Sequence, residues 1–129
     1  MKLSKGLIRA DIIAACQAID YYDEKKIRDI KNVAAYHLQQ ATEKLIKYQI
    51  YEKCSDVDYS QMYTHNIDRL IAYSEAKSLS LIVPSYIREN CVSISTWEAG
   101  SRYDIGFSIR IDMLKKAYEI ISKWERQVR

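Results

Sequence analysis

The amino-acid sequence predicts an all-α fold, an up-down antiparallel bundle of four or five helices, from two observations. First, the 129 residues include only 3 Gly and 1 Pro, whereas average usage would make these two residues roughly 12% of a chain. Few such residues mean few tight turns. Second, apolar residues recur at steps of three and four, and strand-like alternation is never sustained over four residues. The length fits one domain, so we expect a single helical domain over residues 1–129.

The first helix is predicted over residues 7–22, where core-facing residues recur at steps of four, three and four. They are Ile8, Ile12, Ala15 and Ile19. The strongly charged segment 21–31 follows and must contain a connection between helices. Asp29 or Asn32 can cap the helix that comes next, because short polar side chains satisfy the free N–H groups of a first turn.

The second helix has the clearest pattern in the chain, and its stripe is Ala34, Leu38, Ala41, Leu45 and Tyr48. Two of these residues are alanines, which let helix axes approach closely, so we expect this helix at the centre of the bundle. The other face carries Gln39, Gln40, Glu43, Lys44 and Lys47. Glu43 and Lys47 stand four residues apart in the favourable order for an exposed ion pair.

Three further helices are predicted in the rest of the chain. Polar residues 54–63 form a long loop, after which Thr64 or Asn66 caps a short third helix. Pro84 begins a fourth helix, which we expect to end near Trp97. Gly100 and Gly106 then bracket a turn, and the last helix has one apolar stripe, composed of Ile109, Met113, Ala117, Ile120 and Trp124.

The charge balance and the cysteines exclude several classes of protein. Lys and Arg outnumber Asp and Glu by 20 to 17, too small an excess to indicate nucleic-acid binding on charge alone. The basic side of the last helix is either a solvated face or, together with tyrosines, an RNA-binding surface; it carries Arg110, Lys116, Lys123 and Arg126. The apolar runs are too short for a membrane span. Three cysteines without a Cys-x-x-Cys pair indicate neither disulfides nor zinc, so we expect a cytoplasmic protein.

Catalytic and metal-binding groups are scarce. His37 and His65 are the only histidines, and neither supplies the set of histidine and carboxylate ligands at helical spacing that a metal site in a bundle requires. We expect His37 to be packed or half-exposed, and His65 to cap or hydrogen-bond at a helix start. Cys16 and Cys91 fall on faces expected to be buried. The sequence therefore predicts no metal, no cofactor and no catalytic residue.

Three segments together resemble the HEPN domain family. The stretch AYHLQQATEKLIK at residues 35–47 is similar to the family's His- and Gln-containing stretch that runs into Ala-x-Glu-Lys-x-x-Lys. The stretch THNIDRL at residues 64–70 is similar to its Thr-His-Asp-Leu element, and SRYD at residues 101–104 to its Arg-Tyr-Pro element. Their order and spacing match the family across nearly the whole chain.

The resemblance implies a dimeric HEPN-like helical bundle and one of two functional branches. In the first branch, HEPN proteins are metal-independent endoribonucleases, many of them toxins, with an Arg followed after four to six residues by a His. Arg102 matches the family's arginine, but Phe107, Ser108 and Ile109 occupy the positions where the histidine would fall. Cleavage through a 2′-hydroxyl needs a proton acceptor and donor. The ribonuclease with a degenerate active site is therefore the alternative.

The second branch, a non-catalytic binding module, is the favoured interpretation. The resemblance implies a homodimer paired with a minimal nucleotidyltransferase, in a toxin-antitoxin or related setting, that binds nucleotide or RNA. We expect a ligand or RNA groove at the dimer interface, lined by Arg102, Tyr103, Asp104 and Arg110. A structural ion pair between Arg102 and Asp104 or Glu98 is the other interpretation. Family-motif residues without an assigned role are His37, Gln40, Glu43, Lys44 and His65.

The aromatic residues carry one more expectation. Tyr occurs 11 times and Phe once, and a ring with a polar tip suits a half-buried interface between subunits. We therefore expect several tyrosines outside the core stripes to be shared between subunits. The candidates are Tyr36, Tyr51, Tyr63 and Tyr103.

Overall fold

The computed structural model describes residues 3–103 and 106–128, and within these ranges the regular structure is entirely helical. The helices are α1 (Lys5–Lys25), α2 (Ile30–Lys53), α3 (Tyr59–Met62), α4 (Ile67–Ala76), α5 (Ser85–Glu89), α6 (Cys91–Tyr103) and α7 (Ile111–Gln127). Five are long and α3 and α5 have 4 and 5 residues, so the predicted all-α bundle is confirmed.

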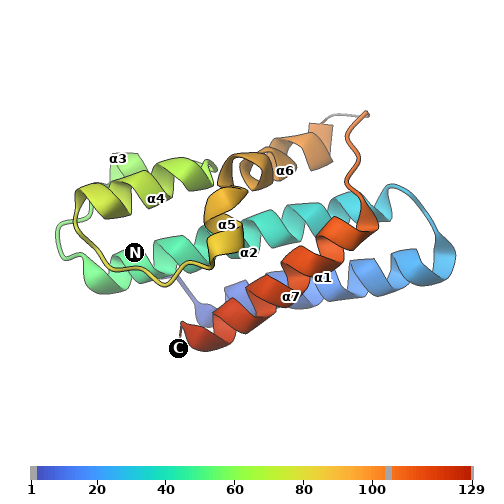
Figure 1. Ribbon diagram of the computed structural model, residues 1–129, viewed down its shortest axis with the longest axis horizontal. Coiled ribbons are helices and arrows are strands. Elements are labelled where there is room, and N and C mark those ends of the chain that lie inside the picture. Colours follow the sequence, from blue (N-terminus) through green and yellow to red (C-terminus); the bar gives the residue numbers. More distant parts are fainter. Residues whose placement is uncertain (1–2, 104–105, 129) are drawn as a thin grey trace.

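Helix α2 lies at the centre of the bundle, as predicted. It packs against α1 and α7 on one side and against α4 and α6 on the other (Figure 1). Ala34, Ala35 and Ala41 are fully buried along it, which allows neighbouring helix axes to come close. Because α2 is covered on two sides, its polar residues as well as its apolar stripe face other helices.

The ends of α1 follow local capping rules. The Ser4 hydroxyl accepts a hydrogen bond from the Gly6 N–H at 3.1 Å, and Lys26 ends the helix in the left-handed region with φ of 57°. Asp29 and Asn66 occupy the N-cap positions of α2 and α4, but their side chains make no capping hydrogen bond. Instead, the first N–H of α4 donates to the Ser95 hydroxyl of α6.

A short segment outside the helices, residues 79–84, connects α4 to α5 and is held by hydrogen bonds from buried side chains. Buried Gln49 exchanges two hydrogen bonds with the backbone of Ile82, at 2.7 and 2.9 Å. The indole N–H of buried Trp124 donates to the same carbonyl at 2.6 Å. A connection without helical hydrogen bonds is thus held by two buried side chains from α2 and α7.

Helix α6 runs further than the sequence suggested. We expected one helix from Pro84 to near Trp97 followed by a turn from Gly100, whereas the structure divides this range at Asn90 into α5 and α6, and α6 continues to Tyr103. Gly100 has a packing role inside the helix, because a Cβ there would lie 2.5 Å from Cδ2 of the Phe107 ring. The expected turn is therefore wrong over residues 100–103, and Arg102 stands in the last helical turn.

Two other expectations need correction. The predicted long loop at residues 54–63 contains the one-turn helix α3, whose first turn is capped by Asp58 through a hydrogen bond from the Ser60 N–H. Cys16 and Cys91 are half-buried rather than buried, since each lies at the edge of its helix's core face.

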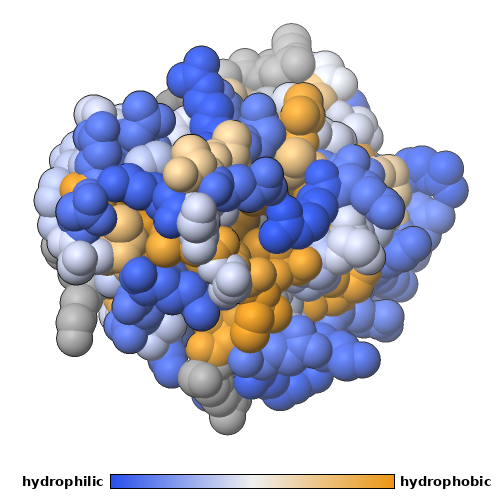
Figure 2. Space-filling model, turned by 60° about the vertical axis from the view of Figure 1, so that its left-hand side comes forward, coloured by the Kyte–Doolittle hydropathy of each residue, from blue (hydrophilic) through white to orange (hydrophobic). Residues whose placement is uncertain are grey.

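One face of the molecule carries an apolar patch surrounded by hydrophilic side chains (Figure 2). A groove of about 430 Å³ lies between residues 82–86 and α7, with Ile82, Ile120 and Trp124 in its lining. Within the described residues, the structure has no helix that is both long and apolar enough to cross a membrane.

Candidate functional site

Two clusters of charged side chains lie on different sides of α2, and together they contain the charged family-motif residues. The first, here called the His65 cluster, joins α2 to the start of α4 and to α6; it consists of Gln39, Glu43, Lys47, His65, Glu98 and Arg102. The second, the Asp11 cluster, joins α1 to α2 and consists of Asp11, His37 and Lys44.

Glu43 is the acceptor at the centre of the His65 cluster. Its Oε1 lies 2.9 Å from Nδ1 of His65 and accepts from the Gln39 amide at 3.2 Å. Its Oε2 accepts from Nζ of Lys47 at 2.9 Å. Glu43 is only 5% exposed, so the expected exposed pair with Lys47 is wrong: α4 and α6 cover this face of α2. A buried carboxylate needs such partners to remain charged.

Glu98 of α6 is the second buried carboxylate, also 5% exposed. Its Oε1 forms an ion pair with the guanidinium of Arg102, one helical turn later, and lies 3.9 Å from Nε2 of His65. One carboxylate oxygen therefore faces both the histidine and the arginine. The structural ion pair considered for Arg102 is present, with Glu98 as the partner.

The cluster is layered from inside to outside. The Glu43 and Glu98 side chains are 6% and 7% exposed, whereas those of His65 and Arg102 are 57% and 43% exposed. The Arg102 guanidinium also lies over the ring of Tyr36, 5.6 Å from its centre. The His65 and Arg102 side chains thus face solvent, while the carboxylates that hold them are underneath.

Backbone and amide contacts fix the histidine. The Gln39 side chain donates to the His65 carbonyl at 3.0 Å, and the Gln40 amide donates to Oε1 of Gln39 at 2.8 Å. His65 is therefore hydrogen-bonded to side chains of α2 through both its ring and its backbone carbonyl. The hydrogen-bonding role predicted for this histidine is confirmed, and Gln40 joins the His65 cluster indirectly.

The Asp11 cluster has a single carboxylate, 8% exposed, between two donors. Oδ1 lies 2.8 Å from Nδ1 of His37 and Oδ2 accepts from Nζ of Lys44 at 2.6 Å. Burial alone raises the pKa of the Asp11 carboxyl, but the hydrogen bonds and charges of His37 and Lys44 outweigh it, so the pKa lies below its ordinary value. His37 is half-buried, as predicted.

Of the four residues predicted to line the groove, Arg102 and Arg110 lie in different surroundings in the structure. Arg102 is in the His65 cluster. Arg110 is the N-cap of α7, highly exposed, and pairs with Asp112 at 2.8 Å. Tyr103 is the last residue of α6, and Asp104 lies outside the described residues. A groove formed by all four remains a prediction.

Sequence reasoning missed Gln39 and Asp11 as parts of these clusters, and it named Glu98 only as one of two alternative partners of Arg102. Glu98 and Arg102 stand four residues apart, a spacing that predicts a pair once the helix is known to continue through Gly100. Asp11 lies on the α2-facing edge of α1, next to a core stripe. Partners for its carboxylate are 26 and 33 residues away, so no local pattern could have identified them.

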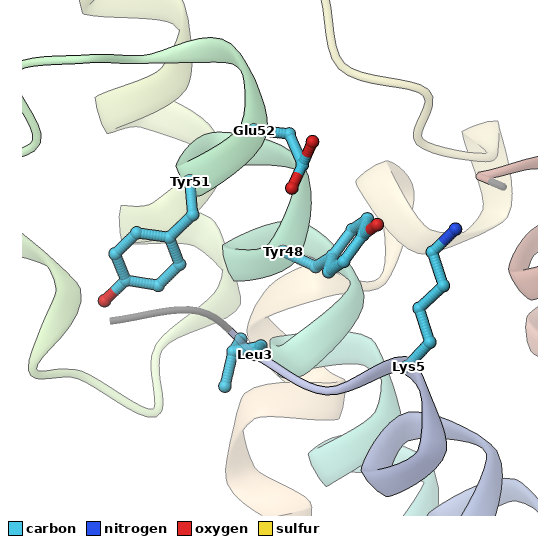
Figure 3. Close-up of a pocket in the computed structure, with 5 residues that line it drawn as sticks. All are labelled: Leu3, Lys5, Tyr48, Tyr51 and Glu52. Carbon is cyan, nitrogen blue, oxygen red and sulfur yellow. The ribbon is translucent and has the colours of Figure 1, made fainter.

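A separate cavity of about 230 Å³ lies at the other end of α2 and contains none of these residues. It is lined by Leu3, Lys5, Tyr48, Tyr51 and Glu52, and the Tyr48 ring stands between Glu52 and Lys5 (Figure 3). Nζ of Lys5 lies 5.3 Å from the centre of that ring. Across the part of the chain that is described, no group of three or more His, Cys, Asp or Glu side chains could hold a metal ion.

Comparison with models of known protein families gives a match over most of the chain. The model of the HEPN domain family matches residues 15–127. The matched segment contains the whole His65 cluster and, from the Asp11 cluster, His37 and Lys44. No curated protein and no solved structure matches the chain.

Proposed function

Since the chain belongs to the HEPN domain family, we propose that it is a non-catalytic HEPN binding module, a homodimer that binds nucleotide or RNA phosphates at the His65 cluster. The observation that carries the proposal is the layering of this cluster, in which His65 and Arg102 are exposed above Glu43 and Glu98. The guanidinium offers a planar pair of donors that matches a phosphate.

The buried carboxylates support binding rather than oppose it. Glu43 and Glu98 hold His65 and Arg102 in place before a ligand arrives, so little side-chain entropy is lost on binding. Lys47 and Arg102 balance the charges of the two carboxylates. Tyr36, under the guanidinium, supplies a face beside which a base can stack.

Fluorescence anisotropy with a labelled single-stranded RNA, and calorimetry with ATP, test the binding site. Arg102→Ala should weaken binding at least tenfold, and His65→Ala several-fold. Arg88→Ala is the matched control, because Arg88 is 42% exposed and also pairs with a glutamate, Glu75, but lies on α5. Unchanged affinity in both the Arg102 and the His65 variants contradicts the proposed site.

A minimal nucleotidyltransferase is the protein partner we propose, on the basis of family membership. The neighbouring reading frame identifies the candidate, and co-purification of the two chains tests it. A stable complex supports the pairing. Failure of two folded, purified chains to associate at micromolar concentration removes the nucleotidyltransferase while leaving the phosphate site standing.

The second candidate function, a metal-independent endoribonuclease with a degenerate site, is favoured by one observation. An arginine and a histidine do face the same oxygen of Glu98, although they are 37 positions apart in the chain. A histidine there could accept the 2′-hydroxyl proton. Incubation with structured RNA in EDTA tests it: cleavage that Arg102→Ala and His65→Ala both abolish would establish the enzyme, and cleavage that neither changes would exclude these residues.

A further inference from the structure

The groove of about 430 Å³ lies between the second half of α7 and the residues that lead into α5 (Figure 1). Its surface is mostly apolar, because residues 78–87 include no charged side chain. The apolar residues of its lining are Ile82, Val83, Pro84, Ile120 and Trp124. The Ile82 side chain is 45% exposed, whereas Trp124 is fully buried beneath the groove.

The wall that carries Ile82 is held in place before any partner binds. The N–H and the carbonyl of Ile82 are both hydrogen-bonded to buried Gln49, and the same carbonyl accepts from the indole of Trp124. The backbone of Ile82 is therefore fixed from inside while its side chain remains open to solvent. A large apolar side chain on a rigid backbone gains burial on binding and loses little conformational entropy.

The charged side chains at the groove are positive. Of the described residues that line it, Lys123 alone is charged. Nζ of Lys116 lies 5.0 Å from the centre of the Tyr86 ring, which is also part of the lining. The two lysines are seven residues apart on α7, about 10 Å along the helix axis, and Ile120 stands between them.

The remaining charges of α5 and α7 do not line the groove. Four ion pairs account for most of them: Lys115 with Asp23, Arg110 with Asp112, Glu125 with Arg9, and Arg88 with Glu75. Glu89, Glu119 and Arg126 are exposed outside the lining. Glu119 is within one turn of both lysines, but in the described part of the chain it forms an ion pair with neither. Lys116 and Lys123 therefore have no carboxylate partner across the groove.

We propose that this groove binds a segment of another protein in which a large apolar side chain stands between two acidic residues about 10 Å apart. The apolar side chain covers Ile82 and Ile120, and the two carboxylates contact Lys116 and Lys123. The inference goes beyond the proposed function, because no residue of the His65 cluster lines the groove.

The groove fits an acidic protein segment better than RNA, although it lies on the basic side of α7. A nucleic-acid base stacks on an exposed ring face. Here Lys116 lies over the Tyr86 ring, and the Trp124 ring is fully buried. The contact surface that remains is aliphatic, since Ile82 and Ile120 provide it, and it matches an apolar side chain.

Selection from a library of random peptides displayed on phage, carried out against the full chain, tests the chemistry of the partner. Enriched peptides should contain Leu, Ile, Phe or Trp with Asp or Glu on both sides. Fluorescence anisotropy with a labelled synthetic copy of one enriched peptide then gives the affinity. Enrichment of peptides without acidic residues, or no enrichment at all, overturns the proposal.

Two variants test the place of binding. Lys123→Glu should weaken the peptide at least tenfold through like-charge repulsion, and exchange of the peptide's acidic residues for Lys should restore its affinity for this variant. Ile82→Ser should weaken it as much, and the backbone hydrogen bonds of residue 82 remain, so thermal unfolding should show a folded chain. Lys53→Glu, at an exposed position of α2, is the matched control. Equal affinity of all three variants and the wild type overturns the proposal.

The same variants identify any other occupant. Loss of self-association in Ile82→Ser, measured by sedimentation velocity without any peptide binding, would assign the groove to a second copy of the chain. Loss of RNA affinity in Lys123→Glu would assign it to RNA, and either result overturns the proposal. Peptide binding by a chain that binds neither RNA nor ATP supports the groove and removes only the ligand site of the proposed function.

Discussion

The two charged clusters beside α2 contain similar groups arranged for different purposes. Each has a buried carboxylate contacted by one histidine and one lysine. In the Asp11 cluster the histidine and lysine side chains are only 27% and 23% exposed. The carboxylate and both of its partners therefore lie mostly buried between α1 and α2. In the His65 cluster a second carboxylate and an arginine are added, and the histidine is 57% exposed.

The difference shows what distinguishes a structural ion pair from a candidate binding site. The Asp11 cluster joins two helices that are consecutive in the chain, and its single carboxylate is fully used by two donors. The His65 cluster is assembled from three separate segments of the chain, and its cationic groups extend beyond the carboxylates. Exposure of the positive groups, rather than the presence of an ion pair, is what favours ligand binding.

The largest expected effect is on stability, from removal of the carboxylate that holds the His65 cluster together. Glu43→Ala leaves three donors without their acceptor, among them Lys47 with a 16% exposed side chain, and should cost about 3 to 4 kcal/mol. Urea denaturation measures it. Glu52→Ala, at an exposed position of the same helix, should change the free energy of unfolding by less than about 0.5 kcal/mol. An equally small loss of unfolding free energy in both variants would mean that the His65 cluster contributes nothing to the stability of the fold.

For the Asp11 cluster the expected effect depends on pH. Asp11→Asn should cost about 2 kcal/mol at pH 7, because it removes a buried charge that both His37 and Lys44 contact. The pKa of this carboxyl is lowered by folding, so its contribution is present above the ordinary value of 3.8 and is lost as the pH falls through the folded value. Urea unfolding at pH 7, 5 and 3 measures the difference between variant and wild type. It should stay constant down to pH 5 and shrink below pH 4.

Gly100→Ala tests the continuation of α6 that carries Arg102. Alanine normally stabilises a helix interior relative to glycine by about 1 kcal/mol. Here its Cβ would meet the Phe107 ring at 2.5 Å, so we expect destabilisation of about 1 to 2 kcal/mol instead. Thermal unfolding gives the sign. Adding Phe107→Ala should restore the normal preference, and a stabilising Gly100→Ala in the otherwise unchanged chain would disprove the contact.

The smallest effect on stability is expected for Arg102→Ala. Its side chain is 43% exposed, so loss of its pair with Glu98 should cost at most about 1 kcal/mol, although the proposed loss of RNA affinity is tenfold. Thermal unfolding measures the loss of stability, and the anisotropy titration measures the loss of RNA affinity. A loss of several kcal/mol would assign Arg102 to folding rather than to ligand binding.

Much of the fold follows from periodicity alone, because a helix is a local structure. The stripe containing Leu38 and Leu45 predicted α2 and its central position. The end of α6 was missed because glycine usually breaks a helix. Here the missing side chain of Gly100 leaves space for the Phe107 ring, seven residues later, and the helix continues to Tyr103. The burial of Glu43 was missed for a related reason. An i, i+4 pair with Lys47 is the same in sequence whether the surrounding helices cover it or not.

The site could be predicted only through the family resemblance, which selected His65, Glu43 and Arg102 without placing them together. Glu43 lies in α2, and His65 lies 22 residues later in the connection just before α4, so their contact depends on how α4 packs on α2. Packing of this kind is a tertiary property that no single segment encodes.

The two histidines of the chain allow the most direct test, since one lies in each cluster. Histidine-selective 15N labelling followed by titration with ATP or single-stranded RNA reports on both clusters in one experiment. Binding at the His65 cluster should shift the ring signals of His65 strongly and those of His37 little. A titration in which His37 responds while His65 is unchanged, or in which neither responds at millimolar ligand, would contradict the proposed site.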